Sequence, residues 1–148
     1  MGWTEARAQI QALLDGLSIT DPVVANIVRV YPKPPGTIQD APSFVMFGAS
    51  KRPERRSSGW RIMHYRLRVQ LFIGDSDVDQ AAAIAEGFGD ALINAVDGHL
   101  QLGGEARLIH EEVGEIVSLE YPGGSSRFFV GFEAFFDVSI QSDVTYGS

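Results

Sequence analysis

Residues 63–73 read MHYRLRVQLFI. Every second position from Met63 to Ile73 is apolar, and the positions between them are polar or charged except for Phe72. A period of two is that of a β-strand with one buried face. We therefore predict a long, half-buried strand here, and the other elements are placed relative to it.

Amphipathic helices are predicted before and after this strand. Apolar residues recur at helical spacing over residues 5–17, where Thr4 is a suitable N-cap. A second apolar stripe begins after residues 74–77 and runs to about Val96, and Gly98 follows where a helix would end. Each helix has one face to bury against the strands.

The segment before residue 63 predicts two short strands and a loop. Asn26–Tyr31 and Ser43–Phe47 are apolar enough for strands, whereas the proline-rich residues 32–36 cannot join the interior of a sheet. Residues 49–59 are small, charged or proline, and none of them suits a core. We predict a long exposed loop over 49–59.

The C-terminal third predicts a long hairpin. Arg107–Tyr121 is typical of a strand, with a change of phase at residues 113–115 that indicates a bulge. Glycines and serines after Tyr121 favour a turn over 121–127, and an unbroken apolar face then runs from Phe128 to Ile140.

These elements fit one domain over residues 1–148. The fold class predicted is α+β: a mostly antiparallel sheet with a long hairpin, packed with two main helices. The chain has no cysteine, which excludes a disulfide scaffold and a thiolate metal site. We expect neither a signal peptide nor a membrane segment, because no basic stretch precedes an apolar core and charges interrupt every apolar run.

Charge is divided unevenly along the chain. The segment from Lys51 to Arg68 holds seven basic residues and one acid, a net of +6, whereas the chain from Asp75 onward holds two basic residues and 14 acids, a net of −12. Three interpretations remain open: self-association, which we favour, then a solvated loop, then contact with DNA phosphates. In the first, the basic segment of one copy lies on the acidic surface of the next, and two phenylalanines on the polar face of the last strand add an apolar contact. The residues proposed for this interface are Lys51, Arg52, Arg55, Arg56, Arg66, Arg68, Phe129 and Phe135.

One motif suggests a metal site. Asp75, Asp77, Asp79 and Glu86 match positions of a calcium-binding loop, but Gln80 stands where that loop needs glycine. We interpret the aspartates as the N-terminal cap of the second helix. The sequence has no recognisable nucleophile or zinc-binding motif, so we expect no enzyme activity, no metal and no cofactor.

The order and character of these segments resemble the tail terminators of long-tailed bacteriophages, a family of tail-completion proteins. The resemblance begins with the end of a short N-terminal helix (13–17), a proline-rich turn (31–35) and a segment that leads into a strand (39–44). It continues with a long strand (65–73), the start of the helix that follows it (77–81) and the segment before the closing hairpin (100–104).

The resemblance implies a structural virion protein without catalytic residues. Such a protein is assembled in the host cytoplasm and forms a hexameric ring at the head-proximal end of the tail. The ring would stop polymerisation of the tail tube protein and offer a joining surface to a head or neck completion protein, and passing contact with DNA in its lumen is a further possibility. The segments that would make these contacts here are 49–59 and 121–127. Another neck or head-completion connector and, less favoured, a metal-binding α/β enzyme are the alternatives.

Overall fold

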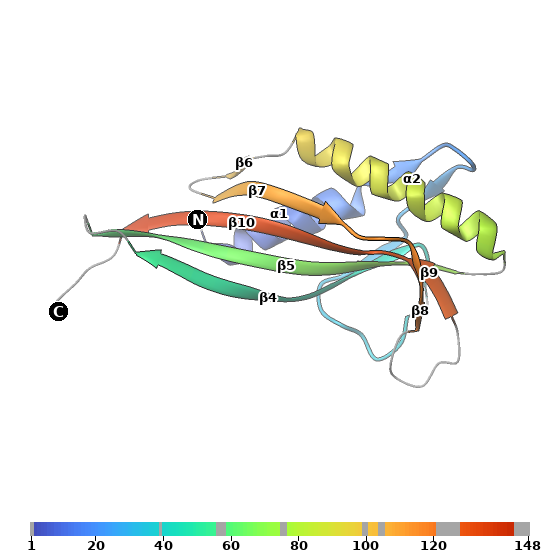
Figure 1. Cartoon of the computed structure of the whole chain (residues 1–148), viewed down its shortest axis with the longest axis horizontal. Coiled ribbons are helices and arrows are strands. Elements are labelled where there is room, and N and C mark those ends of the chain that lie inside the picture. Colours follow the sequence, from blue (N-terminus) through green and yellow to red (C-terminus); the bar gives the residue numbers. More distant parts are fainter. Residues whose placement is uncertain are drawn as a thin grey trace.

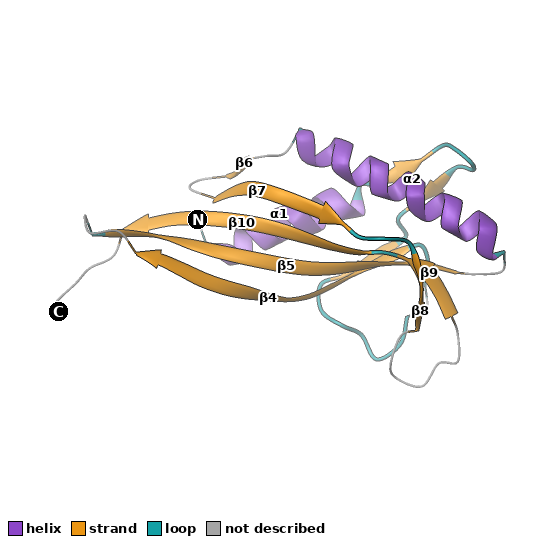
Figure 2. Cartoon of the chain, viewed as in Figure 1, coloured by secondary structure: helices purple, strands orange, loops and turns teal. Residues whose placement is uncertain are grey.

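The computed structural model describes most of the chain: residues 2–38, 40–55, 59–74, 77–98, 101–103, 106–120 and 128–143. Helices α1 (Trp3–Asp15) and α2 (Val78–Asp97) pack together on one face of a long, twisted sheet (Figures 1 and 2). The sheet is mostly antiparallel. The predicted α+β class, with two helices and a long hairpin, is confirmed. No helix in the ranges described above is long and apolar enough to span a membrane.

The main sheet places strands from both halves of the chain side by side. Its order is β3 (Arg29–Tyr31), β4 (Ser43–Arg55), β5 (Trp60–Gly74), β10 (Glu133–Asp143), β7 (Ala106–Val113) and β6 (Gln101–Gly103). Among the strand pairs that the structure describes in this sheet, only β3–β4 is parallel. At one end, β8 (Val117–Glu120) pairs with β9 (Phe128–Gly131), and β9 also pairs with the end of β5. A small separate ladder joins β1 (Ser18–Ile19) and β2 (Ala25–Asn26).

The core lies between the helices and one face of β5 and β10. The alternating residues Leu67, Val69 and Leu71 are completely buried, as the period of two predicted. They pack in one cluster with the helical stripes, including Ile10 of α1 and Phe88 of α2. The opposite face of the same strands carries mostly polar side chains, so the two faces of the sheet have different chemistry.

Both helix starts are capped by acidic side chains. Asp77 accepts a hydrogen bond of 3.2 Å from the Gln80 amide, and α2 then includes Asp79 and Glu86 within its turns. The structure therefore has a capped helix where the calcium motif would need a loop; Asp75 lies outside the described residues. The helix α1 begins at Trp3, one residue before Thr4, so its N-cap is Gly2 and not Thr4. The Gly2 amide donates a hydrogen bond of 2.9 Å to the Glu5 carboxylate.

The prediction of a loop over residues 49–59 is wrong for residues 49–55. These residues belong to β4, which stays paired with β5 as far as Arg55 opposite Arg61; residues 56–58 lie outside the described part. The prediction failed because it required buried side chains, whereas a strand needs only a partner for its backbone groups. β5 supplies that partner, and the result is a long hairpin.

The C-terminal hairpin is confirmed, but both of its strands are interrupted. The chain leaves β7 at Val113 and enters β8 at Val117, so the bulge predicted at 113–115 is a break between two strands. The irregularity in β7 lies instead at Ile109, which the β10 register skips. The second strand is divided at Phe132, and the predicted turn over 121–127 lies outside the described residues.

A second, smaller core occupies the opposite face of the sheet at its β9 end. Its buried members are Tyr31, Ile38, Val45, Phe72 and Phe129. Phe129 is 1% exposed, and its ring meets Phe72 edge to face at 5.4 Å. The prediction that Phe129 lies on a surface that meets a neighbour is therefore wrong for this chain, because β3 and the segment after it cover that ring.

Candidate interaction surface

The sheet extends well beyond the helices as a narrow arm (Figure 1). We define the arm as residues 50–55 of β4 and 60–65 of β5, with the end of β10 beside them. At its base, Trp3 of α1 stacks on Tyr65 with ring centroids 4.4 Å apart and planes 3° from parallel. Past this contact the β4 side chains are mostly exposed. The arm is held by backbone pairing and presents its side chains outward.

The outer edge of the arm is formed by β4. β3 pairs with β4 only at residues 43–45, and no other described strand pairs with the outer edge of β4 beyond that point. A register shift between Met46 and Ala49, a proline at position 53 and several basic side chains mark this edge. All three features oppose the addition of another strand. The arm is therefore suited to contacts through side chains and not through strand pairing.

Two of the predicted interface arginines are bound within the chain itself. The Arg66 guanidinium donates to both oxygens of Asp137 at 3.0 and 2.9 Å and to Glu112 at 2.9 Å. The hydrogen bond to Glu112 and, after it, the one to Asp137 raise the pKa of Arg66 above its usual value. The guanidinium also lies over the ring of Phe135, 4.2 Å from its centroid. Arg66 and Phe135 are thus partners of each other.

Arg68 lies two residues after Arg66 on the same face of β5, and its environment is similar. Its guanidinium lies 3.7 Å from Glu133 and 4.1 Å from the ring centroid of Phe47. Glu133 also accepts a hydrogen bond of 2.9 Å from Gln70. The acids that neutralise Arg66 and Arg68 are therefore in the same chain, which corrects the expectation that the whole basic segment faces a neighbouring copy.

The basic residues that project outward are those nearer the tip of the arm. Between Lys51 and Arg61 the sequence has five basic residues and one acid, Glu54, a net of +4. Lys51, Arg52 and Arg55 are exposed, whereas Arg56 lies outside the described residues. The described part of the arm near its tip is therefore a cationic surface.

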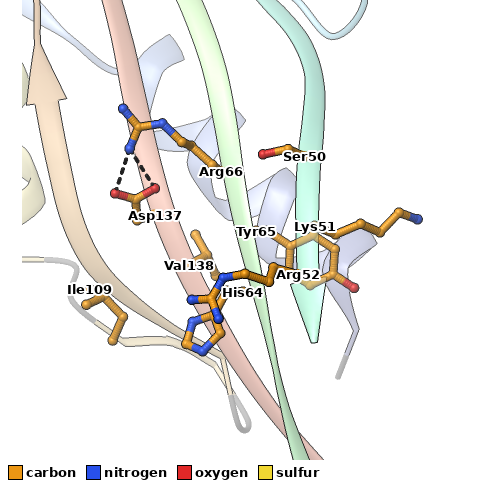
Figure 3. Close-up of a pocket in the computed structure, with 9 residues that line it drawn as sticks. All are labelled: Ser50, Lys51, Arg52, His64, Tyr65, Arg66, Ile109, Asp137 and Val138. Carbon is orange, nitrogen blue, oxygen red and sulfur yellow. Dashed lines mark hydrogen bonds and ion pairs between the residues drawn. The ribbon is translucent and has the colours of Figure 1, made fainter. Parts of the chain in front are cut away.

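A groove of about 460 Å³ lies at the base of this surface (Figure 3). Figure 3 shows Arg52 and His64 beside each other, whereas Arg66 turns away toward Asp137. Nε2 of His64 lies 3.5 Å from a carboxylate oxygen of Glu54 on the neighbouring strand. Across the described ranges, no group of three or more histidine and acidic side chains could hold a metal ion. The groove extends the cationic surface of the tip toward the body.

The acidic counterpart of the arm is α2. This helix contains no lysine or arginine, and its four acids are exposed: Asp79, Glu86, Asp90 and Asp97. α2 lies over the end of the sheet away from the arm tip (Figure 1). Acidic and cationic surfaces are thus at opposite ends of one molecule. The sequence shows this imbalance, but only the strand order shows which charges are already paired.

Comparison with models of known protein families and with the sequences of curated proteins finds no match to this chain.

Proposed function

We propose that this protein is a structural component that assembles with copies of itself into a ring. The observation that carries the proposal is the cationic arm, which projects past the packed helices at the end opposite the acidic α2 (Figure 1). Oppositely charged surfaces steer association and fix its orientation. An arm with a protected outer edge also favours a defined contact over open-ended strand pairing.

The position of the two surfaces gives the assembly its geometry. Because they lie at opposite ends of one molecule, the contact between them is head to tail. Such a contact leaves one free surface on each partner, so copies add until the rotation between them closes a ring. A closed ring uses every arm and every acidic surface, which explains how assembly would stop at a fixed number of subunits.

The resemblance to tail terminators suggests where such a ring acts. We propose that it caps the head-proximal end of a phage tail tube, stops addition of tube protein and provides the surface that a head or neck protein joins. Its action is binding, without chemistry. A fold of two helices on a mainly antiparallel sheet is the architecture that this resemblance implies.

Adding the purified chain to polymerising tail tube protein of the same phage tests this function. We expect shorter tubes, each with a ring at one end in electron micrographs. The matched control is a variant with Arg52→Glu and Arg55→Glu, which should leave the tubes long. Tubes of unchanged length with bare ends in the presence of the wild-type chain would contradict the proposed function.

A further inference from the structure

A second groove lies between α2 and the segment that joins β7 to β8. It has a volume of about 400 Å³. Glu86 and Asp90 contribute two exposed carboxylates, and Ile93 beside them is 40% exposed. Apolar side chains complete the lining: Val113, Ile116 and Phe132. The groove therefore combines apolar walls with two negative charges.

We propose that this groove receives basic side chains from the arm of a second copy of the chain. This inference rests on the proposed function and names the contact that would hold the ring together. Lysine and arginine lay their aliphatic stems on apolar surface while their charged ends reach a polar partner. Lys51, Arg52 and Arg55 on the arm have this dual character, and the groove offers both halves of the complement.

The contact has to join two copies. The arm and the α2 end of the sheet are separated along the longest axis of the molecule (Figure 1), so an arm does not reach the groove of its own chain. The arm also carries a net charge of +4 between Lys51 and Arg61, whereas the groove contributes two carboxylates. Apolar surface and charge thus select the same pairing.

Complementary charge reversal tests the inference. The arm variant carries Arg52→Glu and Arg55→Glu, and the groove variant carries Glu86→Lys and Asp90→Lys. In each variant alone, the reversed side chains face side chains of the same sign at every contact, and we expect self-association to weaken at least about tenfold. An equimolar mixture restores opposite charges between positions 52 and 55 of each arm and positions 86 and 90 of the groove that it meets. We therefore expect the mixture to recover the wild-type oligomer with the two variants alternating, as measured by native mass spectrometry.

A second variant controls for net charge on the same helix. Asp79→Lys with Asp97→Lys makes the same change of charge as the groove variant, but neither residue lines the groove. Because Asp79 and Asp97 still belong to the acidic surface of α2, we expect this control to weaken assembly, but clearly less than the groove variant does. Circular dichroism and thermal unfolding verify that each variant is folded, and if the groove variant is not, Glu86→Gln with Asp90→Asn replaces it and should weaken assembly in the same direction.

The outcomes separate this inference from the proposed function. Assembly of a folded groove variant at wild-type strength would overturn the inference and leave the ring intact as a proposal. Failure of the mixed variants to recover the oligomer would overturn it as well. A wild-type chain that stays monomeric under all these conditions would instead contradict the proposed function itself.

Discussion

Arg66 on β5 and Asp137 on β10 lie directly opposite each other and share two hydrogen bonds of 3.0 and 2.9 Å. In the sequence they belong to the basic segment and to the acidic remainder, 71 positions apart. The central pair of strands therefore cancels part of the charge division inside one subunit. The charges of α2 and of Lys51, Arg52 and Arg55 on the arm are exposed and remain for other molecules.

The first prediction concerns the strength of this pair. Because Arg66 is 41% and Asp137 32% exposed, solvent screens their attraction. A double-mutant cycle with Arg66→Met and Asp137→Asn should give a coupling of about 0.2–1 kcal/mol in urea unfolding at low salt, falling as salt is added. The control cycle of Arg55→Met with Asp137→Asn should give no coupling. A coupling of several kcal/mol, unaffected by salt, would contradict this description of the pair.

The second prediction concerns the place where β9 ends. A Cβ added to Gly131 would overlap the Leu71 carbonyl oxygen on β5. Gly131→Ala should therefore lower the free energy of unfolding by about 3 kcal/mol or more, because the backbone itself would have to move. Gly48→Ala is the matched control, since no heavy atom lies within 4 Å of the added carbon, and its effect should stay within about 0.5 kcal/mol. Equal unfolding midpoints for the two variants in denaturant would show that β5 and β9 are not in this register.

The third prediction concerns pH and the start of α1. Hydrogen bonds from the backbone amides of Glu5 itself and of Gly2 lower the pKa of the Glu5 carboxyl group. A carboxyl whose pKa is lower in the folded state stabilises the fold above its unfolded pKa of about 4.3, and this contribution is lost as the pH falls through the folded value.

Glu5→Gln tests this dependence. The variant should be less stable than the wild type at neutral pH, and the difference in free energy of unfolding should shrink as the pH falls below about 4. Asp15→Asn at the other end of α1 is the control: it removes an acid from the negative end of the helix dipole and should leave stability unchanged or raise it. A Glu5→Gln difference that is the same at acid and neutral pH would contradict the capping role.

The fourth prediction concerns the salt dependence of assembly. Arg55→Glu with Arg56→Glu should weaken self-association by at least about tenfold at low salt and reduce its sensitivity to added salt. Arg29→Glu with Lys33→Glu changes the net charge equally at two exposed positions away from the arm, and should have little effect. Sedimentation velocity at several salt concentrations measures both variants. Identical oligomers for the wild type and the Arg55/Arg56 variant at all salt concentrations would remove the arm from the interface.

The sequence was a good guide wherever one face of an element is buried. Leu67, Val69 and Leu71 show a period of two because the helices cover them, and that period is visible without a structure. The arm gave no such signal, because residues such as Arg52 are exposed and β4 is held there by backbone pairing. Strand periodicity reports burial, so it misses a strand that projects beyond the core.

The candidate interaction surface could be predicted only in part. The excess of positive charge after Lys51 is plain in the sequence, but the register that places Asp137 beside Arg66 is not. Phe129 was misplaced for a related reason. It lies on the face of the last strand that is otherwise polar, and the second core that buries it there depends on a distant segment around Ile38.

The native mass of the assembled chain decides whether copies of this protein close into a ring. Native mass spectrometry at low ionic strength, over a wide range of protein concentration, distinguishes a closed ring from a monomer and from an open series of polymers. We expect one dominant species with a fixed number of subunits, six by the resemblance to tail terminators, that dissociates when salt is raised. A chain that remains monomeric at every concentration, or that forms a continuous ladder of sizes, would contradict it.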